Sequence, residues 1–483
     1  MDKLLERYQP TIGLEVQMQA NTRSKAYCGC ANIYGAEPNT HVCPVCTAQP
    51  GALPVPNRGV FEKAIRIALA LGSKIARQTH FDRKNYFYPD LPKGYQITQH
   101  PCPIGSGGML RFPGERYGVE ADCVVDIERV HMEEDTAKSS HDATGKTLID
   151  FNRAGVPLLE IVTEPCIHEP RIAYAYLLNM MNMLEYLDVS TCSMEEGSLR
   201  VDTNISLAPR GSDQLGSKVE VKNINSFKAV QAALEYEMVR QAELLDAGER
   251  ILQETRHWDD KRGITLPGRS KESSMDYRYF PEPDIPPLMV GDEWFAKIKA
   301  SMPQLPRATR ERLIAEGLSP YDAWVLIFDK SRYEYFATVV QTGASPKPVV
   351  KWVNGGLAAL LKESEHDYTD CPLSPSHLAE LIALQEGGKL SGRAAKEVLE
   401  RTFNGEGTPE EVIKKQNLGQ MSDSSEVEAI VRQTIESNPS EVEQYRAGKT
   451  KLAKFFVGQV MKATRGKADA QLVNELVTKL LDE

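Results

Sequence analysis

The feature that most constrains the fold of this 483-residue chain is a change of sequence character near residue 295. Before that point, apolar runs rich in β-branched residues alternate with glycine and proline turns, which predicts a body with many strands. After it, strand-like runs nearly disappear and short helical segments are joined by Pro, Gly or Ser turns. A chain of this length is too long for a single core. We therefore predict an α+β body over residues 1–295, an all-α domain over 296–405 and a small all-α tail over 406–483.

Hydrophobic periodicity places a few elements inside the predicted body. Helices are expected at about 61–72, 170–188 and 227–250, and strands at 198–207 and 217–222. The methionines of the 170–188 segment fall on its apolar face, so we expect them in the core. Residues 264–290 are rich in proline and aromatics and are expected to form loops.

Three glutamates lie inside apolar, strand-like runs: Glu15 in IGLEV, Glu160 in PLLEIV and Glu220 in VEVKN. Burying a carboxylate costs several kcal/mol unless a cation or hydrogen-bond donors compensate. Because three such positions occur, we expect strands that converge on Mg²⁺, which prefers oxygen ligands and bridges to phosphates. The alternative is a set of ordinary strands that each have one face in water.

An acidic segment lies between the first two of these glutamates. Residues 120–135 contain seven carboxylates, among them Glu133 and Glu134 in the run HMEED, against only Arg129 and His131. A solvated acidic surface would give the same composition. The apolar residues on both sides of Glu160 favour a buried site instead.

Residues 81–99 combine cations with aromatic residues and turns. Arg83, Lys84 and Lys93 lie there, and Gly94 follows Lys93 directly. Cations beside glycine suit polyphosphate binding. No Walker A motif and no kinase-type glycine-rich loop is present, so an ATP site would be of another type.

Four of the nine cysteines form two close pairs. Cys28 and Cys30 are followed, after twelve residues, by Cys43 and Cys46 in CPVC. Paired thiolates at this spacing can complete a tetrahedron around Zn²⁺, and four cysteines predict a structural site rather than an open, catalytic one. His41 is an alternative ligand. The low number of cysteines is typical of a reducing compartment.

Charge and hydropathy narrow the partners. No apolar run is long enough to span a membrane, and the start of the chain resembles neither a signal nor a transit peptide, so a cytoplasmic protein is expected. The net charge of −10 argues against a generally basic nucleic-acid binder. One local exception is the stretch 446–467, which has seven basic residues and no acid and favours contact with a phosphate backbone. The phenylalanines in it are expected to be core residues.

Long motifs of this chain resemble the GatB/GatE family, the kinase-like subunits of tRNA-dependent amidotransferases. They include IGLEV, CPVC followed by PGALPVPN, NYFYPDLPKGYQI, HMEED, GVPLLEIVTEP, EEGSLRVDTNIS, VEVKNINSFKA, DYRYFPEPDIPPL and GQVMKATRGKADAQLVNELV. The resemblance runs nearly from end to end. At 483 residues the chain has no room for the inserted domain of the archaeal relatives.

The resemblance implies an antiparallel-sheet cradle related to glutamine synthetase and guanido kinases, then a helical domain and a YqeY-like tail. It implies a glutamine-dependent ligase that phosphorylates the side-chain carboxylate of Glu-tRNA(Gln) or Asp-tRNA(Asn) with ATP. Ammonia would come through a tunnel from an amidase subunit (GatA), with a small subunit (GatC) completing a heterotrimer. The helical and tail domains would bind the tRNA.

The resemblance also implies roles for single residues. Glu15, Glu134 and Glu160 would hold Mg²⁺, and Lys93 and Arg200 would stabilise the transferred phosphoryl group. ATP and metal contacts are further expected from Gln17, Glu133, Glu220, Arg83 and Lys84. No general base is needed, because the substrate carboxylate is ionised at neutral pH.

Two positions depart from the family pattern. Gln17 and Met275 replace histidines, so we expect a weaker or water-mediated metal contact at Gln17 and assign no role to position 275. Two rival functions stay open: a zinc-stabilised tRNA-binding scaffold without catalysis, and a free-standing ligase for a small carboxylate.

Overall fold

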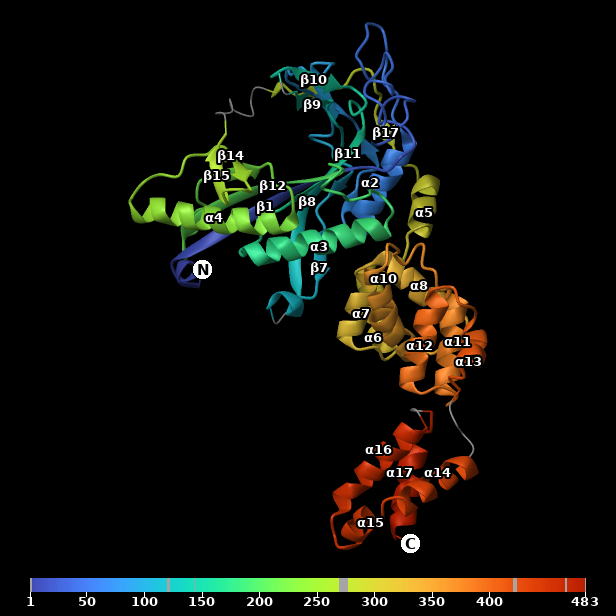
Figure 1. The fold of residues 1–483 in the computed structure, drawn as a ribbon. Coiled ribbons are helices and arrows are strands. Elements are labelled where there is room, and N and C mark those ends of the chain that lie inside the picture. The colour runs from blue at the N-terminus through green and yellow to red at the C-terminus, as the bar shows by residue number, and fades with distance from the viewer. Residues whose placement is uncertain are drawn as a thin grey trace. The chain divides into compact units, whose positions relative to one another are not determined.

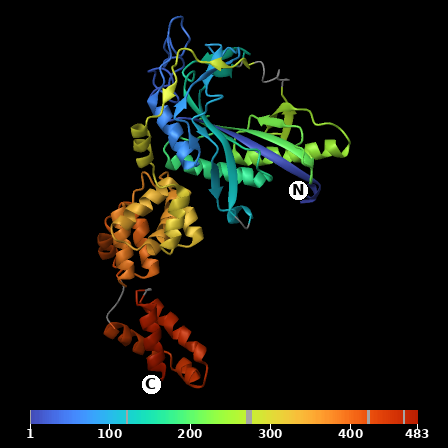
Figure 2. The same ribbon diagram turned by 180° about the vertical axis from the view of Figure 1, so that it is seen from behind.

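The computed structural model describes residues 2–119, 122–142, 144–268, 277–419, 424–464 and 467–482. Figures 1 and 2 show the ribbon from opposite sides. The chain forms two compact units, Met1–Arg307 and Ala308–Glu483. The first unit extends past residue 295 because α5 (Asp292–Ala300) packs against α2 (Arg58–Ala70), where Trp294 Nε1 donates to Glu62 Oε1 at 2.8 Å.

The first unit contains most of the strands. Besides α2 and α5, its elements are α1 (Asp2–Arg7), β1 (Tyr8–Gln19), β2 (Lys74–Ile75), β3 (Gln78–Thr79), β4 (Asp82–Asn85), β5 (Tyr95–Thr98), β6 (Gly105–Ser106), β7 (Met109–Phe112), β8 (Cys123–Glu134), β9 (Lys138–His141), β10 (Thr147–Asp150), β11 (Pro157–Thr163), α3 (Pro170–Tyr186), β12 (Leu199–Pro209), β13 (Val219–Lys222), α4 (Phe227–Asp246), β14 (Glu254–Asp259), β15 (Ile264–Pro267), β16 (Phe280–Pro281) and β17 (Leu288–Met289).

A ten-stranded sheet organises this unit. Its strand order is β15-β14-β13-β12-β1-β11-β8-β6-β2, and β7 also pairs with β8. All of its pairs are antiparallel except β13 with β14, which are parallel. The sheet is therefore mixed rather than purely antiparallel, because α4 carries the chain back between β13 and β14 as a crossover connection.

The sheet has one apolar and one polar face. Helices α3 and α4 lie side by side along one face, as Figure 1 shows, and α4 packs on β12. Leu14 and Val16 of β1 and Ile161 of β11 are buried in the hydrophobic core of this unit. Because side chains alternate along a strand, the residues between these positions point to the other face. That face carries the candidate site.

Most of the elements predicted in the body are present. The three helices correspond to α2, α3 and α4, and the two strands to β12 and β13. Met180 and Met183 are buried, which confirms that they are core residues. The prediction of loops for 264–290 is wrong in part, because β15, β16 and β17 lie there as short strands paired with β14, β4 and β3. Met275 lies outside the described residues.

The second unit is helical throughout its described part, where no strand occurs. Its elements are α6 (Pro306–Ala315, which begins in the first unit), α7 (Pro320–Ile327), α8 (Lys330–Gln341), α9 (Pro346–Lys351), a π-helical turn (Trp352–Leu357), α10 (Ala358–Glu363), α11 (Pro375–Glu386), α12 (Gly392–Phe403), α13 (Pro409–Gln416), α14 (Ser424–Glu436), α15 (Pro439–Arg446), α16 (Ala453–Ala463) and α17 (Ala470–Asp482).

Two separate hydrophobic clusters support this unit, one formed by residues between 313 and 412 and one by residues between 427 and 481. Phe456 is fully buried in the second cluster and Phe455 packs against it, so both belong to the core as predicted. Within the described ranges, no helix combines the length and apolar character needed to cross a membrane.

Candidate active site

Strand pairing collects polar side chains on the open face of the large sheet. Gln17 of β1 lies opposite Glu160 of β11, and Glu160 lies opposite His131 of β8. In the other direction Glu15 lies opposite Asp202 of β12. Beyond them, Asn204 of β12 pairs with Glu220 of β13. Directly opposed residues share one face of a sheet, so these side chains form a continuous polar surface over five strands.

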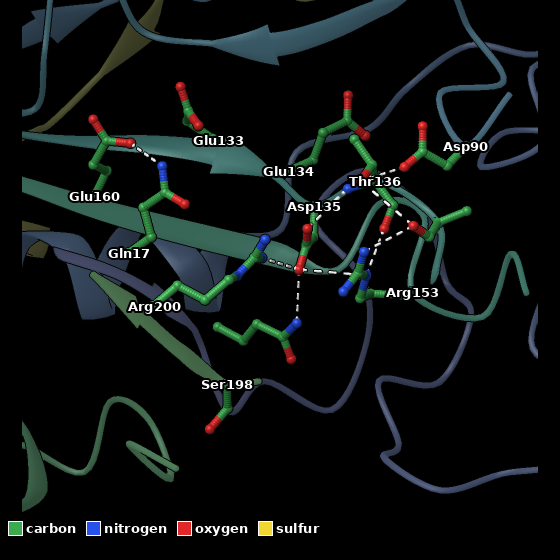
Figure 3. Close-up of polar contacts among 12 residues, drawn as sticks. Gln17, Asp90, Glu133, Glu134, Asp135, Thr136, Arg153, Glu160, Ser198 and Arg200 are labelled. Atoms are coloured by element: carbon green, nitrogen blue, oxygen red, sulfur yellow. Dashed lines mark hydrogen bonds and ion pairs between the residues drawn. The ribbon is translucent and has the colours of Figure 1, made fainter. Parts of the chain in front are cut away.

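One group on this face is almost completely buried. His131 Nε2 lies 3.3 Å from Glu133 Oε1 and 3.6 Å from Glu160 Oε1. Gln17 Nε2 donates to Glu160 Oε2 at 2.7 Å, a contact drawn in Figure 3. Thr98 Oγ1 donates to Glu133 Oε1 at 2.7 Å. Ligand atoms of His131, Glu133 and Glu160 all lie within 4.8 Å of one another, which is close enough to share one metal ion.

The pKa values show that this group lacks positive charge. Burial raises the pKa of Glu160, and the neighbouring Glu133 and Glu15 raise it further. Burial would also raise the pKa of Glu133, but hydrogen bonding to His131 and the charge of Lys84 lower it to about 2. Burial lowers the pKa of His131, but the two carboxylates outweigh this and raise it overall. A divalent cation would compensate the same carboxylates more completely.

A second acidic group lies beside the first. Glu15, Asp202 and Glu220 also have ligand atoms within 4.8 Å of one another. Lys222 Nζ lies 3.0 Å from Glu220 Oε1 and also contacts Asp202. Asn204 Nδ2 donates to Glu15 Oε1 at 3.0 Å, while its buried Oδ1 has no hydrogen-bond partner among the described residues. Carboxylates beside an unpartnered amide oxygen are the donor set that Mg²⁺ prefers, so the residues fit that ion.

Both groups open into one cleft of about 860 Å³. Its lining also includes basic and aromatic side chains: Lys84, Arg129, Lys218, Lys222, Tyr277 and Tyr279. Burial alone would lower the pKa of Lys84, but Glu133 and nearby tyrosine hydroxyls raise it, so this amine stays protonated. A cleft with acidic groups for cations and basic groups for phosphates suits a metal–nucleotide ligand.

Six residues singled out from the sequence line this cleft: Glu15, Gln17, Lys84, Glu133, Glu160 and Glu220. Glu134 does not, because adjacent strand residues point to opposite faces and Glu133 takes the cleft side. Lys93 Nζ pairs with Glu134, and the Ile97 backbone N–H donates to Glu134 Oε1 at 3.0 Å. Glu134 and Lys93 therefore form a pair with each other, away from Glu160.

Arg200 and Arg83 are also held outside the cleft. Arg200 pairs with Asp135, which further accepts a hydrogen bond from Gln19 Nε2 at 2.7 Å, as drawn in Figure 3. Arg83 Nε lies 2.6 Å from Glu282 Oε2, and Arg83 Nη2 lies 2.9 Å from Asp284 Oδ2. Each arginine thus already has a carboxylate partner.

Sequence reasoning assigned no role to His131, Asp202, Lys222 or Asn204. The alternation within VDTNIS and VEVK could have shown which residues share a face. The pairing of Glu15 with Asp202 depends on strand register, which the sequence alone does not give.

The four cysteines come together on the loop after β1. Ligand atoms of Cys28, Cys30, Cys43 and Cys46 all lie within 4.8 Å of one another, and His41 is not part of this group. The pKa of Cys46 is lowered to about 4 by a hydrogen bond from Cys28 and, to a lesser degree, by the charge of Lys25. A closed set of four thiols, one of them readily ionised, fits a structural zinc site.

Comparison with known proteins identifies relatives of the whole chain. Residues 10–296 match the family model described as the GatB/GatE catalytic domain, and residues 334–481 match the model of the GatB domain. A protein from Caldanaerobacter subterraneus is 47% identical over 478 residues, 99% of this chain and 100% of its own length. Proteins from Thermodesulfovibrio yellowstonii (47%, 99% and 100%) and Brevibacillus brevis (43%, 99% and 100%) are similarly related. All three bear the name of one and the same component of the aspartyl/glutamyl-tRNA(Asn/Gln) amidotransferase.

Proposed function

Because this chain belongs to the GatB/GatE family, we propose that its cleft carries out ATP-dependent activation of Glu-tRNA(Gln), Asp-tRNA(Asn) or both. The chain is a subunit of a tRNA-dependent amidotransferase, a glutamine-hydrolysing carbon–nitrogen ligase that works as a complex. The products are Gln-tRNA(Gln) and Asn-tRNA(Asn). The single observation that carries the proposal is the pair of acidic groups sharing one cleft with basic side chains.

The chemistry explains why such a cleft is needed. A carboxylate is a poor electrophile, so an oxygen of the substrate side chain first attacks the γ-phosphorus of ATP and the bond to the β-phosphate oxygen breaks. Ammonia then attacks the carbon of the acyl phosphate, and inorganic phosphate leaves with the C–O bond pair. Phosphoryl transfer depends mainly on positioning and on neutralising charge, rather than on a protein nucleophile.

The cleft residues divide these tasks. Glu160, Glu133 and His131 would hold one Mg²⁺, and Glu15, Asp202 and Glu220 a second. Bound Mg²⁺ supplies charge neutralisation on the phosphate oxygens. Lys84 is the cation that we assign to the phosphates, because it lines the cleft and its pKa is raised.

The residues outside the cleft receive other roles in this proposal. Glu134 and Lys93 support the end of β8 from the opposite side, since each already has the other as partner. Arg200 orients Asp135 at the start of the turn after β8. Arg83 holds the segment after β16 through Glu282 and Asp284.

The rest of the molecule serves the same reaction. We propose a glutamine synthetase- or guanido kinase-like cradle for the first unit, with structural Zn²⁺ on the four cysteines. The partners are an amidase subunit (GatA), which supplies ammonia, and a small subunit (GatC). The basic stretch 446–467, apart from Arg465 and Gly466, which lie outside the described residues, would contact the tRNA backbone. A cytoplasmic location follows from a tRNA substrate.

Amidation by the reconstituted complex tests this function. We expect Glu160→Gln to lower amidation of mischarged tRNA by about 100-fold or more, because charge stabilisation by a bound metal is worth several kcal/mol. ADP formation should fall in parallel. Glu164→Gln, an exposed carboxylate just after β11, is the matched control and should retain activity.

The same assay separates the rival functions. If wild-type complex binds tRNA but forms no ADP with ATP and mischarged tRNA, the scaffold function is correct and the proposal fails. If ADP forms with free glutamate or aspartate and no RNA, the chain is a free-standing ligase.

A further inference from the structure

Lys25 is a buried cation without a carboxylate partner. Its side chain is fully buried, with Nζ 3.5 Å from Cys46 Sγ and 3.2 Å from the carbonyl oxygen of Phe151. Among the described residues, no Asp or Glu forms an ion pair with it. An ammonium group buried with a single carbonyl oxygen is strongly disfavoured, so a negative charge must lie beside it.

The cysteine cluster supplies that charge. Cys46 is the sulfur nearest to Lys25 and belongs to the four-cysteine group. Four thiolates outweigh the two charges of Zn²⁺, so an occupied site keeps a net negative charge in a place where little water can screen it. Lone-pair donation to a metal is also tuned by the groups that hydrogen-bond to its ligands.

We propose that Lys25 is the charge-balancing, positioning residue of the zinc site, which it serves by pairing with the Cys46 thiolate. This inference rests on the zinc site proposed above. It treats the cation as part of the metal centre, although Lys25 contacts only a ligand and never the ion.

The same lysine links the zinc site to the acidic strand. A β-carbon at Gly155 would lie 3.5 Å from Cys46 Cβ, 3.7 Å from Glu134 Oε2 and 3.8 Å from Lys25 Cδ, and this glycine has a φ of +80°. Its backbone bridges the two regions: Ala26 N–H donates to Gly155 O at 2.9 Å, and Gly155 N–H donates to Asp135 O at 3.0 Å. Loss of zinc or of the Lys25 charge should therefore loosen the turn that leads into β11.

Zinc affinity of the full chain, measured by competition with a chromogenic chelator, tests the proposal. Lys25→Met keeps the length and apolar stem of the side chain but removes its charge. We expect zinc to bind about 10- to 100-fold more weakly, the range found for partners of metal ligands. Lys74→Met, at an exposed position of β2, is the control and should bind zinc like wild type.

A double-mutant cycle distinguishes charge from packing. Cys43→His converts the site to three thiolates and one neutral ligand, so less negative charge remains for Lys25 to balance. Lys25→Met should then reduce zinc affinity by a clearly smaller factor than in the wild-type background. An equal factor in both backgrounds would overturn the proposal, because Lys25 would then act only by filling space.

Two further outcomes are informative. If Lys25→Met does not fold, the cycle is measured with Lys25→Gln, whose neutral amide can still donate to Phe151. Purified wild-type chain without stoichiometric zinc would remove the zinc site itself. Zinc-loaded wild type with unchanged affinity in Lys25→Met would remove this inference alone.

Discussion

Two buried glutamates of the first unit, Glu160 and Glu237, have opposite electrostatic surroundings. Glu237 of α4 accepts hydrogen bonds from Arg240 at 2.9 and 2.8 Å and from Gln241 at 3.1 Å. Arg256 Nε of β14 lies 3.2 Å from its Oε1. Glu160 has only the Gln17 amide and His131. Burial raises the pKa of both carboxyls, but the arginine partners bring that of Glu237 below its usual value.

The difference separates a structural carboxylate from one that is available to a ligand. Arg240 and Arg256 complete the charge balance of Glu237 within the protein, so no cation is needed there. The Glu160 group lacks an arginine partner and opens into the cleft. Incomplete internal compensation in a cleft is a property of functional sites.

The largest effect should appear when each carboxylate is neutralised in turn. Glu237→Gln leaves two arginines without their buried partner and should lower the free energy of unfolding by about 3–5 kcal/mol. Glu160→Gln removes a repulsive buried charge and should leave stability unchanged or raise it when no divalent ion is present. Denaturant unfolding with a metal chelator measures both.

Glu243→Gln, on the exposed side of α4, is the control and should change stability by less than about 0.5 kcal/mol. Equal destabilisation by Glu160→Gln and Glu237→Gln would show that the two sites do not differ in kind.

A smaller effect is expected in the pH dependence of stability without divalent ions. The pKa of Glu237 is lowered in the folded state, so its contribution is present above the unfolded pKa and is lost as the pH falls through the folded value. The pKa of Glu160 is raised, so its destabilising contribution is present at neutral pH and disappears as the pH falls through its folded value.

Removing each group should therefore change the slope in opposite directions. Below about pH 5, Glu237→Gln should lose less stability on acidification than wild type, whereas Glu160→Gln should lose more. Unfolding curves at several pH values check this, and slopes that change in the same direction would contradict it.

The smallest effect concerns Gln17, whose amide N–H faces Glu160. Gln17→His would place a ring nitrogen beside the first acidic group, and imidazole is a stronger ligand than an amide. We expect the Mg²⁺ concentration for half-maximal amidation to fall severalfold, with no change in the stability contributed by Glu237. Magnesium titrations of both proteins measure it, and an unchanged requirement would argue against a metal contact at this position.

The sequence by itself determined much of the architecture and the family. Hydrophobic periodicity gave α2, α3 and α4, and the change of character near residue 295 separated a strand-rich body from helical parts. The spacing of the cysteines predicted one cluster. These features are local or depend on long motifs, which the comparisons with known proteins confirmed for nearly the whole chain.

Only the tertiary structure decided which charged side chains meet. Glu133 and Glu134 are equivalent in composition, yet their strand places just one of them in the cleft. Arg83, Lys93 and Arg200 have cationic side chains suited to phosphate, but each pairs with a carboxylate distant in sequence. The physical reason is that strand register and long-range ion pairs depend on how separate segments pack, and no local pattern contains that information.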